Sequence, residues 1–284
     1  SWSGVFNSFA LSPDGHRLAV GVGSSSDLDI WIKQLDHGPF TRLTFGDHDR
    51  RPAWSPDGRF VAFIRDTGKA GGVFVRAADG TGQERMIARL DRRVQEVTWS
   101  PDGAWLLLRT DNSASGAGDI VGVRTSGDTT PVPLVASPFT ELTPAVSPDG
   151  RWLAYASDES GKSEVYVRPF PNTTSGHWQV STGGGAAPRW SHNGRELFFE
   201  SAPNDLMAAT VTPGAIFEHG TPRRLFTAPG VPFVQSYAPI YDVMPDAQRV
   251  AAIRLSRRTQ APGSGQVIVV ENWLQELKAR MKGR

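Results

Sequence analysis

The tetrapeptide Ser55-Pro56-Asp57-Gly58 recurs along the chain at a nearly constant interval, and this repeat decides the fold prediction. Further copies and their degraded forms begin at Ser12, Ser100, Ser147, Ser191 and Met244. The start-to-start spacings are 43, 45, 47, 44 and 53 residues. This period is typical of the four-stranded blades of a β-propeller. Six copies therefore predict an all-β protein, a six-bladed β-propeller.

The residues of the tetrapeptide have the properties that a tight turn needs. Pro presets φ, the Asp side chain accepts hydrogen bonds from nearby amides, and Gly adopts the positive φ that closes the turn. A short apolar segment such as Ala53-Trp54 precedes each copy, and an alternating segment such as 59–63 follows it. We therefore expect the turn to join the first two strands of each blade. An open β-sandwich with coincidental repeats is the alternative, which six matched turns disfavour.

The repeat also predicts the domain organisation. We expect one propeller over residues 1–271, with blades starting near residues 7, 50, 95, 141, 186 and 238. The sixth blade has three evident strands, so residues 1–6 are expected to supply its fourth and close the ring. Residues 272–284 are predicted to form a C-terminal amphipathic helix packed on the propeller, because Asn272 can cap it and its apolar residues share one face.

Composition excludes several classes of function. The 284 residues include 30 Lys and Arg against 29 Asp and Glu, so a net charge of +1 gives no electrostatic reason to expect nucleic acid. The absence of cysteine excludes disulfides, thiolate catalysis and cysteine-ligated metal centres. No apolar run approaches the roughly 18 to 20 residues of a membrane span, and none is predicted.

No complete catalytic motif is present. The Gly-x-Ser-x-Gly elbow of hydrolases and the His-Arg-Asp and Asp-Phe-Gly motifs of kinases do not occur. Gly161-Lys162-Ser163 resembles the end of a phosphate-binding loop, but Ala156 replaces its first glycine and strands flank it. We predict no cofactor. A divalent metal such as calcium, held by side chains from different blades, is an open alternative.

Propeller geometry predicts where a ligand would bind. The first strand of each blade lines the central channel, and the loop entering it lies at one mouth of that channel. These loops include residues 47–51 and 92–96, which carry charges of both signs. Such a mouth suits a polar peptide, a carboxylate-bearing ligand or a loop of a partner protein. The predicted ligand-binding residues are His48, Asp49, Arg50, Arg93, Glu96, Glu141, Arg189 and Tyr237.

Two stretches carry a family resemblance. Residues 147–199 and 269–278 resemble the TolB-like, PD40-type (WD40-like) propellers, and more narrowly the C-terminal propellers of bacterial serine/threonine protein kinases. The resemblance implies a sensor or protein-interaction domain outside the cytoplasmic membrane, either periplasmic or at the cell surface. It also implies an upstream kinase domain in the full-length protein. Met244-Pro245-Asp246-Ala247 departs from the repeat pattern of the family.

Three functional hypotheses follow. The favoured one is a non-catalytic binding or sensor module that recognises a protein, a peptide or a small polar ligand at the channel mouth. The rival is a propeller enzyme, similar to a lactonase or a lyase, with a divalent metal in the channel. The third is a scaffold without a defined pocket.

Overall fold

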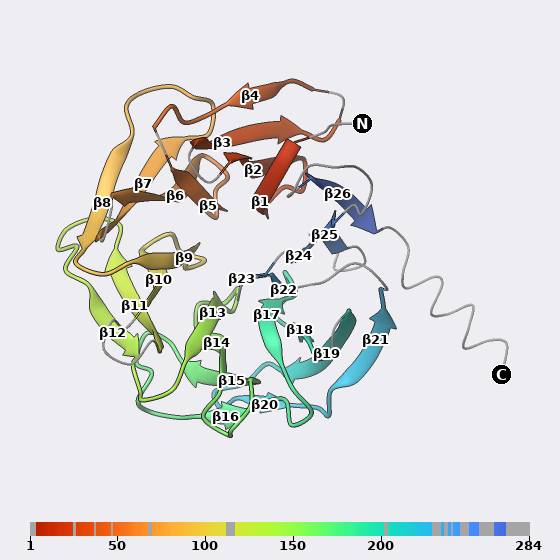
Figure 1. Ribbon diagram of the computed structural model, residues 1–284. Coiled ribbons are helices and arrows are strands. Elements are labelled where there is room, and N and C mark those ends of the chain that lie inside the picture. The colour runs from red at the N-terminus through yellow and green to blue at the C-terminus, as the bar shows by residue number, and fades with distance from the viewer. Residues whose placement is uncertain are drawn as a thin grey trace, which may run out of the picture. The chain divides into compact units, whose positions relative to one another are not determined.

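The computed structural model describes most of the chain as β-strands joined by turns (Figure 1). The described residues are 4–24, 27–36, 38–46, 48–67, 70–111, 117–201, 204–228, 234–235, 238–239, 241–244, 250–255 and 264–270. They form 26 strands, and no helix occurs among them. Accordingly, they contain no helix long and apolar enough to cross a membrane. The helix predicted over 272–284 lies outside the described residues.

The chain divides into two compact units, and the first comprises residues 1–144 and 256–266. Its strands are β1 (Gly4–Leu11), β2 (Arg17–Ser24), β3 (Asp27–Gln34), β4 (Phe40–Arg42), β5 (Asp49–Trp54), β6 (Phe60–Thr67), β7 (Ala70–Ala77), β8 (Arg85–Leu90), β9 (Val94–Trp99), β10 (Trp105–Asp111), β11 (Gly118–Arg124) and β12 (Val132–Val135).

The second unit comprises residues 145–255 and 267–284. Its strands are β14 (Trp152–Ser157), β15 (Glu164–Pro169), β16 (Trp178–Gln179), β17 (Ala186–Trp190), β18 (Glu196–Glu200), β19 (Asp205–Thr212), β20 (Glu218–His219), β21 (Arg223–Thr227), β22 (Val234–Gln235), β23 (Ala238–Pro239), β24 (Tyr241–Val243) and β25 (Val250–Leu255). Two strands contain a boundary between the units, namely β13 (Glu141–Val146) and β26 (Ser264–Val270).

Each repeat forms an antiparallel sheet whose strands follow one another in chain order. The four-stranded sheets are β5-β6-β7-β8, β9-β10-β11-β12 and β13-β14-β15-β16. A five-stranded sheet has the order β17-β18-β19-β20 with β21 also paired to β19, and β22 and β23 form a two-stranded ribbon. The remaining sheet has the order β24-β25-β26-β1-β2-β3-β4. Sequential antiparallel pairing is what short connections between strands allow.

The number of sheets differs from the prediction. The described strands form five sheets of four or more strands, where the repeat count predicted six blades. The reason is that β1 is one continuous strand with two partners. Its residues Gly4 and Val5 pair with β26, whereas Phe6 to Leu11 pair with β2. The first and last repeats are therefore joined in a single seven-stranded sheet.

The repeated tetrapeptide forms the predicted turn. In the second copy, the Ser55 hydroxyl donates to Asp57 Oδ1 at 2.6 Å and accepts the Phe60 amide at 2.9 Å. Asp57 Oδ1 also accepts the Arg59 amide at 3.0 Å, and Gly58 has φ 67°. The equivalent serine accepts the amide five residues later at 2.9 Å in the copies at Ser12, Ser100, Ser147 and Ser191. One set of hydrogen bonds therefore explains why the motif repeats.

The hydrophobic core lies between the faces of consecutive sheets. In the first unit, Val61 and Phe63 of β6 pack with Ile30 of β3, and all three are fully buried. A tryptophan directly before the turn joins one sheet to the preceding one. The Trp54 ring nitrogen donates to the Ala10 carbonyl at 3.0 Å, and Trp99 donates to the Ala53 carbonyl at 3.1 Å. Buried indole groups need such an acceptor, so these bonds fix how the neighbouring sheets pack.

Candidate functional site at the bulged ends of the first strands

Several first strands carry a shift in their pairing register three to five residues before the turn. The pairing register shifts between Phe6 and Ser8 in β1, between Arg50 and Ala53 in β5, and between Ala186 and Arg189 in β17. A β-bulge of this kind inserts an unpaired residue and redirects its side chain. We call the residue four positions before the first residue of each turn the bulge position. Its occupants are Ser8, Arg51, Glu96, Thr143 and Ala187. Arg51 and Ala187 lie inside a register shift, whereas Ser8 pairs with Gly21 and Glu96 pairs with Arg109 next to one.

The backbone at the bulge position is held in place. Arg51 and Thr143 both have φ 55°, and Ala187 has φ 51°, in the left-handed region that residues other than glycine seldom adopt. In the first unit, the Arg51 amide donates to Ser8 Oγ at 3.2 Å, and the Thr143 amide donates to Glu96 Oε1 at 3.4 Å. The side chain of one bulge position thus supports the backbone of the next.

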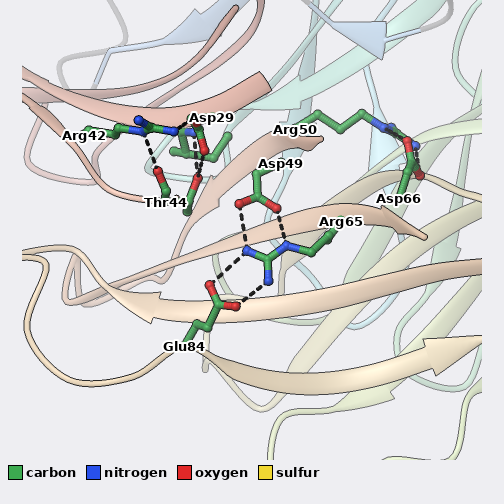
Figure 2. A network of polar contacts seen from close by, with 9 residues as sticks. Asp29, Arg42, Thr44, Asp49, Arg50, Arg65, Asp66 and Glu84 are labelled. Atoms are coloured by element: carbon green, nitrogen blue, oxygen red, sulfur yellow. Dashed lines mark hydrogen bonds and ion pairs between the residues drawn. The ribbon is translucent and has the colours of Figure 1, made fainter. Parts of the chain in front are cut away.

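Arg50 is one of the predicted binding residues, and it is committed to holding the structure together. Its guanidinium donates to Asp66 at 2.6 and 2.9 Å (Figure 2) and to the Val94 carbonyl at 2.6 Å. Its side chain is only 11% exposed. Arg50 therefore fastens β5 to β6 and to β9, the first strand of the next repeat.

Asp49 is likewise committed within the protein. It is fully buried, and its carboxylate accepts two hydrogen bonds from Arg65 at 2.6 and 2.8 Å. Arg65 also contacts Glu84 and so lies between two carboxylates (Figure 2). Burial raises the pKa of Asp49 against the opposing effect of Arg65, while the hydrogen bonds to Asp49 raise the pKa of Arg65. This arrangement engages the buried Asp49 carboxylate within the protein.

Two glutamates among the predicted binding residues are buried, one in β9 and one in β13. Glu96 is 8% exposed, and its carboxylate lies 2.9 Å from Arg109 Nε. Arg109 is also 3.3 Å from Asp111. Glu141 is 1% exposed and accepts a hydrogen bond from the Ser137 hydroxyl. Both glutamates therefore have partners within the first unit.

The other predicted residues are less constrained or lie elsewhere. Arg93 is 56% exposed and lies 3.5 Å from Asp66. His48 precedes β5 with φ 71°. Arg189 belongs to the second unit and donates to the Pro188 carbonyl at 3.1 Å. Tyr237 lies outside the described residues.

Arg51 belongs to the same predicted loop as Arg50 but is not among the eight predicted binding residues. Its side chain differs from theirs in its contacts. It occupies the bulge position of β5 and is half-buried. Its guanidinium forms no hydrogen bond or ion pair with any residue that the structure describes. Burial lowers the pKa of Arg51 to about 10, with Glu96 opposing this effect and Arg50 adding to it. Arg51 is still protonated at neutral pH and is therefore an uncommitted cation.

A second uncommitted group lies in the same row. The Thr143 side chain is 2% exposed, and its hydroxyl has no hydrogen-bond partner in the described part of the chain. Buried hydroxyls almost always have a partner, so this group is an exception in the described structure. The Thr143 amide donates to Glu96, and the charge of Glu96 acts on Arg51. The row in the first unit thus combines a cation and a hydroxyl that have no partner among the described residues.

A groove of about 1120 Å³ lies at the turn end of the same strands. It is bordered by residues 55–60 and 101–103, together with Arg17 and Trp99. Two of its charged groups are engaged locally, because Arg17 donates to the Gly58 carbonyl at 2.9 Å and Asp57 binds its own turn, whereas Arg59, which also lines the groove, is exposed. We therefore place the candidate site at the bulged ends rather than in this groove.

No group of three or more His, Asp or Glu side chains among the described residues is arranged to hold a metal ion. The acidic residues nearest to the bulge positions are paired with arginine instead, as Asp66 is with Arg50 and Glu96 is with Arg109.

No protein-family model matches the sequence. An uncharacterized peptidase, YuxL, of Bacillus subtilis (strain 168) is 28% identical, and the match covers 55% of this chain and 31% of the relative. The chain spans about a third of the length of the curated relatives that it matches.

Comparison with solved structures identifies the fold. The crystal structure of TolB from Acinetobacter baumannii has a TM-score of 0.67 at 17% identity, covering 92% of this chain and 62% of that one. The fold is a TolB-like β-propeller. A structure of oligogalacturonate lyase in complex with manganese has a TM-score of 0.55 at 12% identity, covering 94% of this chain and 89% of that one. This propeller therefore resembles a catalytic protein as well as TolB, and its function has to be argued from its own residues.

Proposed function

We propose that this β-propeller is a binding module that recognises a protein, a peptide or a small polar ligand without catalysing a reaction. The ligand contacts the bulge positions of the first unit. The observation that carries this proposal is Arg51, a desolvated guanidinium without a partner among the described residues.

The contrast between Arg51 and its surroundings supports this function. Asp49, Arg50 and Glu96 have partners in the protein, as buried charges require. A cation that is partly removed from water without a partner lowers stability, and such a cost is typical of groups kept for binding. Arg51 also stands on a strand whose backbone is fixed, and rigid scaffolds of this kind carry binding residues.

The resemblance to TolB-like propellers supports finer parts of the proposal. It favours a protein or peptide partner and an extracytoplasmic location, periplasmic or at the cell surface. A kinase domain upstream in the full-length protein also belongs to the proposal, on the resemblance of residues 147–199 and 269–278 alone.

A propeller enzyme is the competing function, and the likeness to the manganese-bound lyase and the match to a peptidase both favour it. A metal-dependent enzyme would need oxygen or nitrogen ligands that converge on one point. Metal analysis distinguishes the two functions. The purified protein is incubated with manganese or calcium, desalted and analysed for bound metal. The binding module retains less than stoichiometric metal, whereas one tightly held ion per chain would favour the enzyme.

The direct test of the proposed function uses a random heptapeptide library displayed with free carboxyl termini. The wild-type protein is expected to enrich specific sequences that Arg51→Gln fails to enrich. Arg89→Gln serves as the matched control, because Arg89 is an exposed arginine of the same unit on β8. If the wild-type protein enriches no sequence, or if all three proteins enrich the same ones, the proposed binding role of the bulge positions is wrong.

A further inference from the structure

The charges around β5 and β9 can be assigned to partners one by one. Arg50 is paired with Asp66, and Arg109 is paired with Glu96 and approaches Asp111. Arg93 also approaches Asp66. Asp49 and Glu84 share Arg65, so these acids and arginines do not pair one to one. Arg51 forms no ion pair with any described residue, although Glu96 acts on it electrostatically.

The position of Arg51 is fixed before any ligand arrives. Its φ of 55° and the hydrogen bond from its amide to Ser8 hold the backbone at the bulge. Pro52 follows it and restricts the chain further. A guanidinium carried on a fixed backbone loses less conformational entropy when it binds, so the site is pre-organised for a ligand.

The surroundings of Arg51 select the charge of the ligand. The Arg51 guanidinium carries one positive charge without an ion-pair partner among the described residues, and a carboxylate carries the single negative charge that matches it. Glu96 is the acidic group that acts electrostatically on Arg51, and it is buried. A phosphate dianion would therefore bring an excess negative charge close to the Glu96 carboxylate, which costs free energy at low effective dielectric constant.

We propose that Arg51 binds a carboxylate of the ligand, either an acidic side chain or a free C-terminus, and that the Thr143 hydroxyl supplies a further hydrogen bond to the same ligand. This inference rests on the proposed function and names the chemical class that the site recognises. A guanidinium donates two parallel hydrogen bonds to a carboxylate, and such charge-assisted pairs are stronger than neutral ones. Thr143 Oγ1 can donate to a carboxylate or a carbonyl oxygen and at present has no partner among the described residues.

The first experiment observes the site directly with simple anions. Arginine Nε–H resonances are recorded by NMR, and the Arg51 signal is assigned by its absence from Arg51→Gln. Titration with acetate is expected to shift this signal saturably, whereas the Arg89 signal stays in place. Inorganic phosphate at the same concentration is expected to shift it less. No saturable shift with acetate, or tighter binding of phosphate, would overturn the proposal.

The second experiment uses the enriched heptapeptides and separates the two proposals. Each peptide is compared with a copy in which the C-terminus is amidated and with a copy in which its acidic residues are amides. Loss of the essential carboxylate is expected to weaken binding about 30-fold or more, and Arg51→Gln is expected to weaken it equally. Arg51→Lys, which keeps the charge but loses the paired donors, should give an intermediate affinity. If binding depends on Arg51 but no carboxylate matters, the binding function stands and the carboxylate inference is wrong.

Thermal unfolding provides an independent readout of Arg51→Gln. Because the described residues supply no partner to Arg51, its replacement is expected to leave the melting temperature unchanged or to raise it by a few degrees. A large fall would show that the protein itself supplies the counter-charge, which would contradict the proposal.

Discussion

The two ends of strand β5 are built in different ways. At the turn end, Ser55 and Asp57 form the hydrogen bonds that their counterparts form in four other repeats. At the bulged end, the backbone irregularity recurs in several first strands, but the side chain at the bulge position differs in every repeat. The side chains that recur in these turns stabilise the fold. The side chains that differ at the bulge position are not required by the repeated backbone and are therefore available for binding.

The bulged end nevertheless contains structural residues, and the largest expected effect tests one of them. Arg50→Ala should lower the free energy of unfolding by about 3 kcal/mol, because Asp66 would keep a largely buried charge with the exposed Arg93 at 3.5 Å as its remaining described partner. Urea denaturation measures this loss. Arg89→Ala, which removes an exposed arginine of the same unit, should change stability by less than about 0.5 kcal/mol. A loss below about 1 kcal/mol for Arg50→Ala would show that Arg50 is not a structural residue.

A substitution at the turn end should lower the free energy of unfolding less than Arg50→Ala does. Ser55→Ala removes the acceptor of the Phe60 amide and the donor to Asp57, so we expect a loss of about 1–3 kcal/mol. Thr81→Ala is the control, since Thr81 makes a similar hydroxyl contact with Asp79 in an exposed turn. Its replacement should cost almost nothing. Equal losses for the two variants in the same denaturation assay would remove the special role assigned to the buried serine.

Thr143 tests the free hydroxyl of the bulge positions. Thr143→Val keeps the shape of the side chain and removes a buried hydroxyl without a described partner, so stability should rise by about 1 kcal/mol. Thr110→Val provides the contrast, because the buried Thr110 hydroxyl donates to the Asp119 carbonyl at 3.5 Å. That replacement should lower stability. A loss for Thr143→Val as large as that for Thr110→Val would show that the Thr143 hydroxyl is already satisfied.

The smallest expected effect concerns pH. The Ser55 hydroxyl and the Arg59 amide lower the pKa of Asp57, and Ser100 does the same for Asp102. An acid with a lowered pKa in the folded state stabilises the protein above its unfolded pKa of about 3.9, and this contribution is lost as the pH falls through the folded value. Asp57→Asn should therefore flatten the loss of stability below about pH 4 and leave its slope near neutrality unchanged. An unchanged acid slope would contradict this assignment.

The sequence determined the local structure, because its signals act over a few residues. The fixed period of Ser-Pro-Asp-Gly predicted an all-β propeller and the turn that joins the first two strands of each repeat. The all-β propeller and the turn are confirmed, although the number of blades is not. The turn could be predicted because its serine and aspartate bond within the same turn. The sequence also pointed to the segment 47–51, and the binding role of its residues stays a prediction.

The tertiary structure decided which charges are committed within the protein. Arg50 and Arg51 are adjacent and chemically identical, and only the positions of Asp66 on β6 and Val94 on β9 show that Arg50 is held. The sheet count also differed from the repeat count, because β1 pairs with β26 as well as β2. In both cases the partner comes from a distant part of the chain. The sequence by itself thus fixed the repeat, the turn and the strands, whereas pairing between distant residues decided which side chains hold the fold and left Arg51 uncommitted among the described residues.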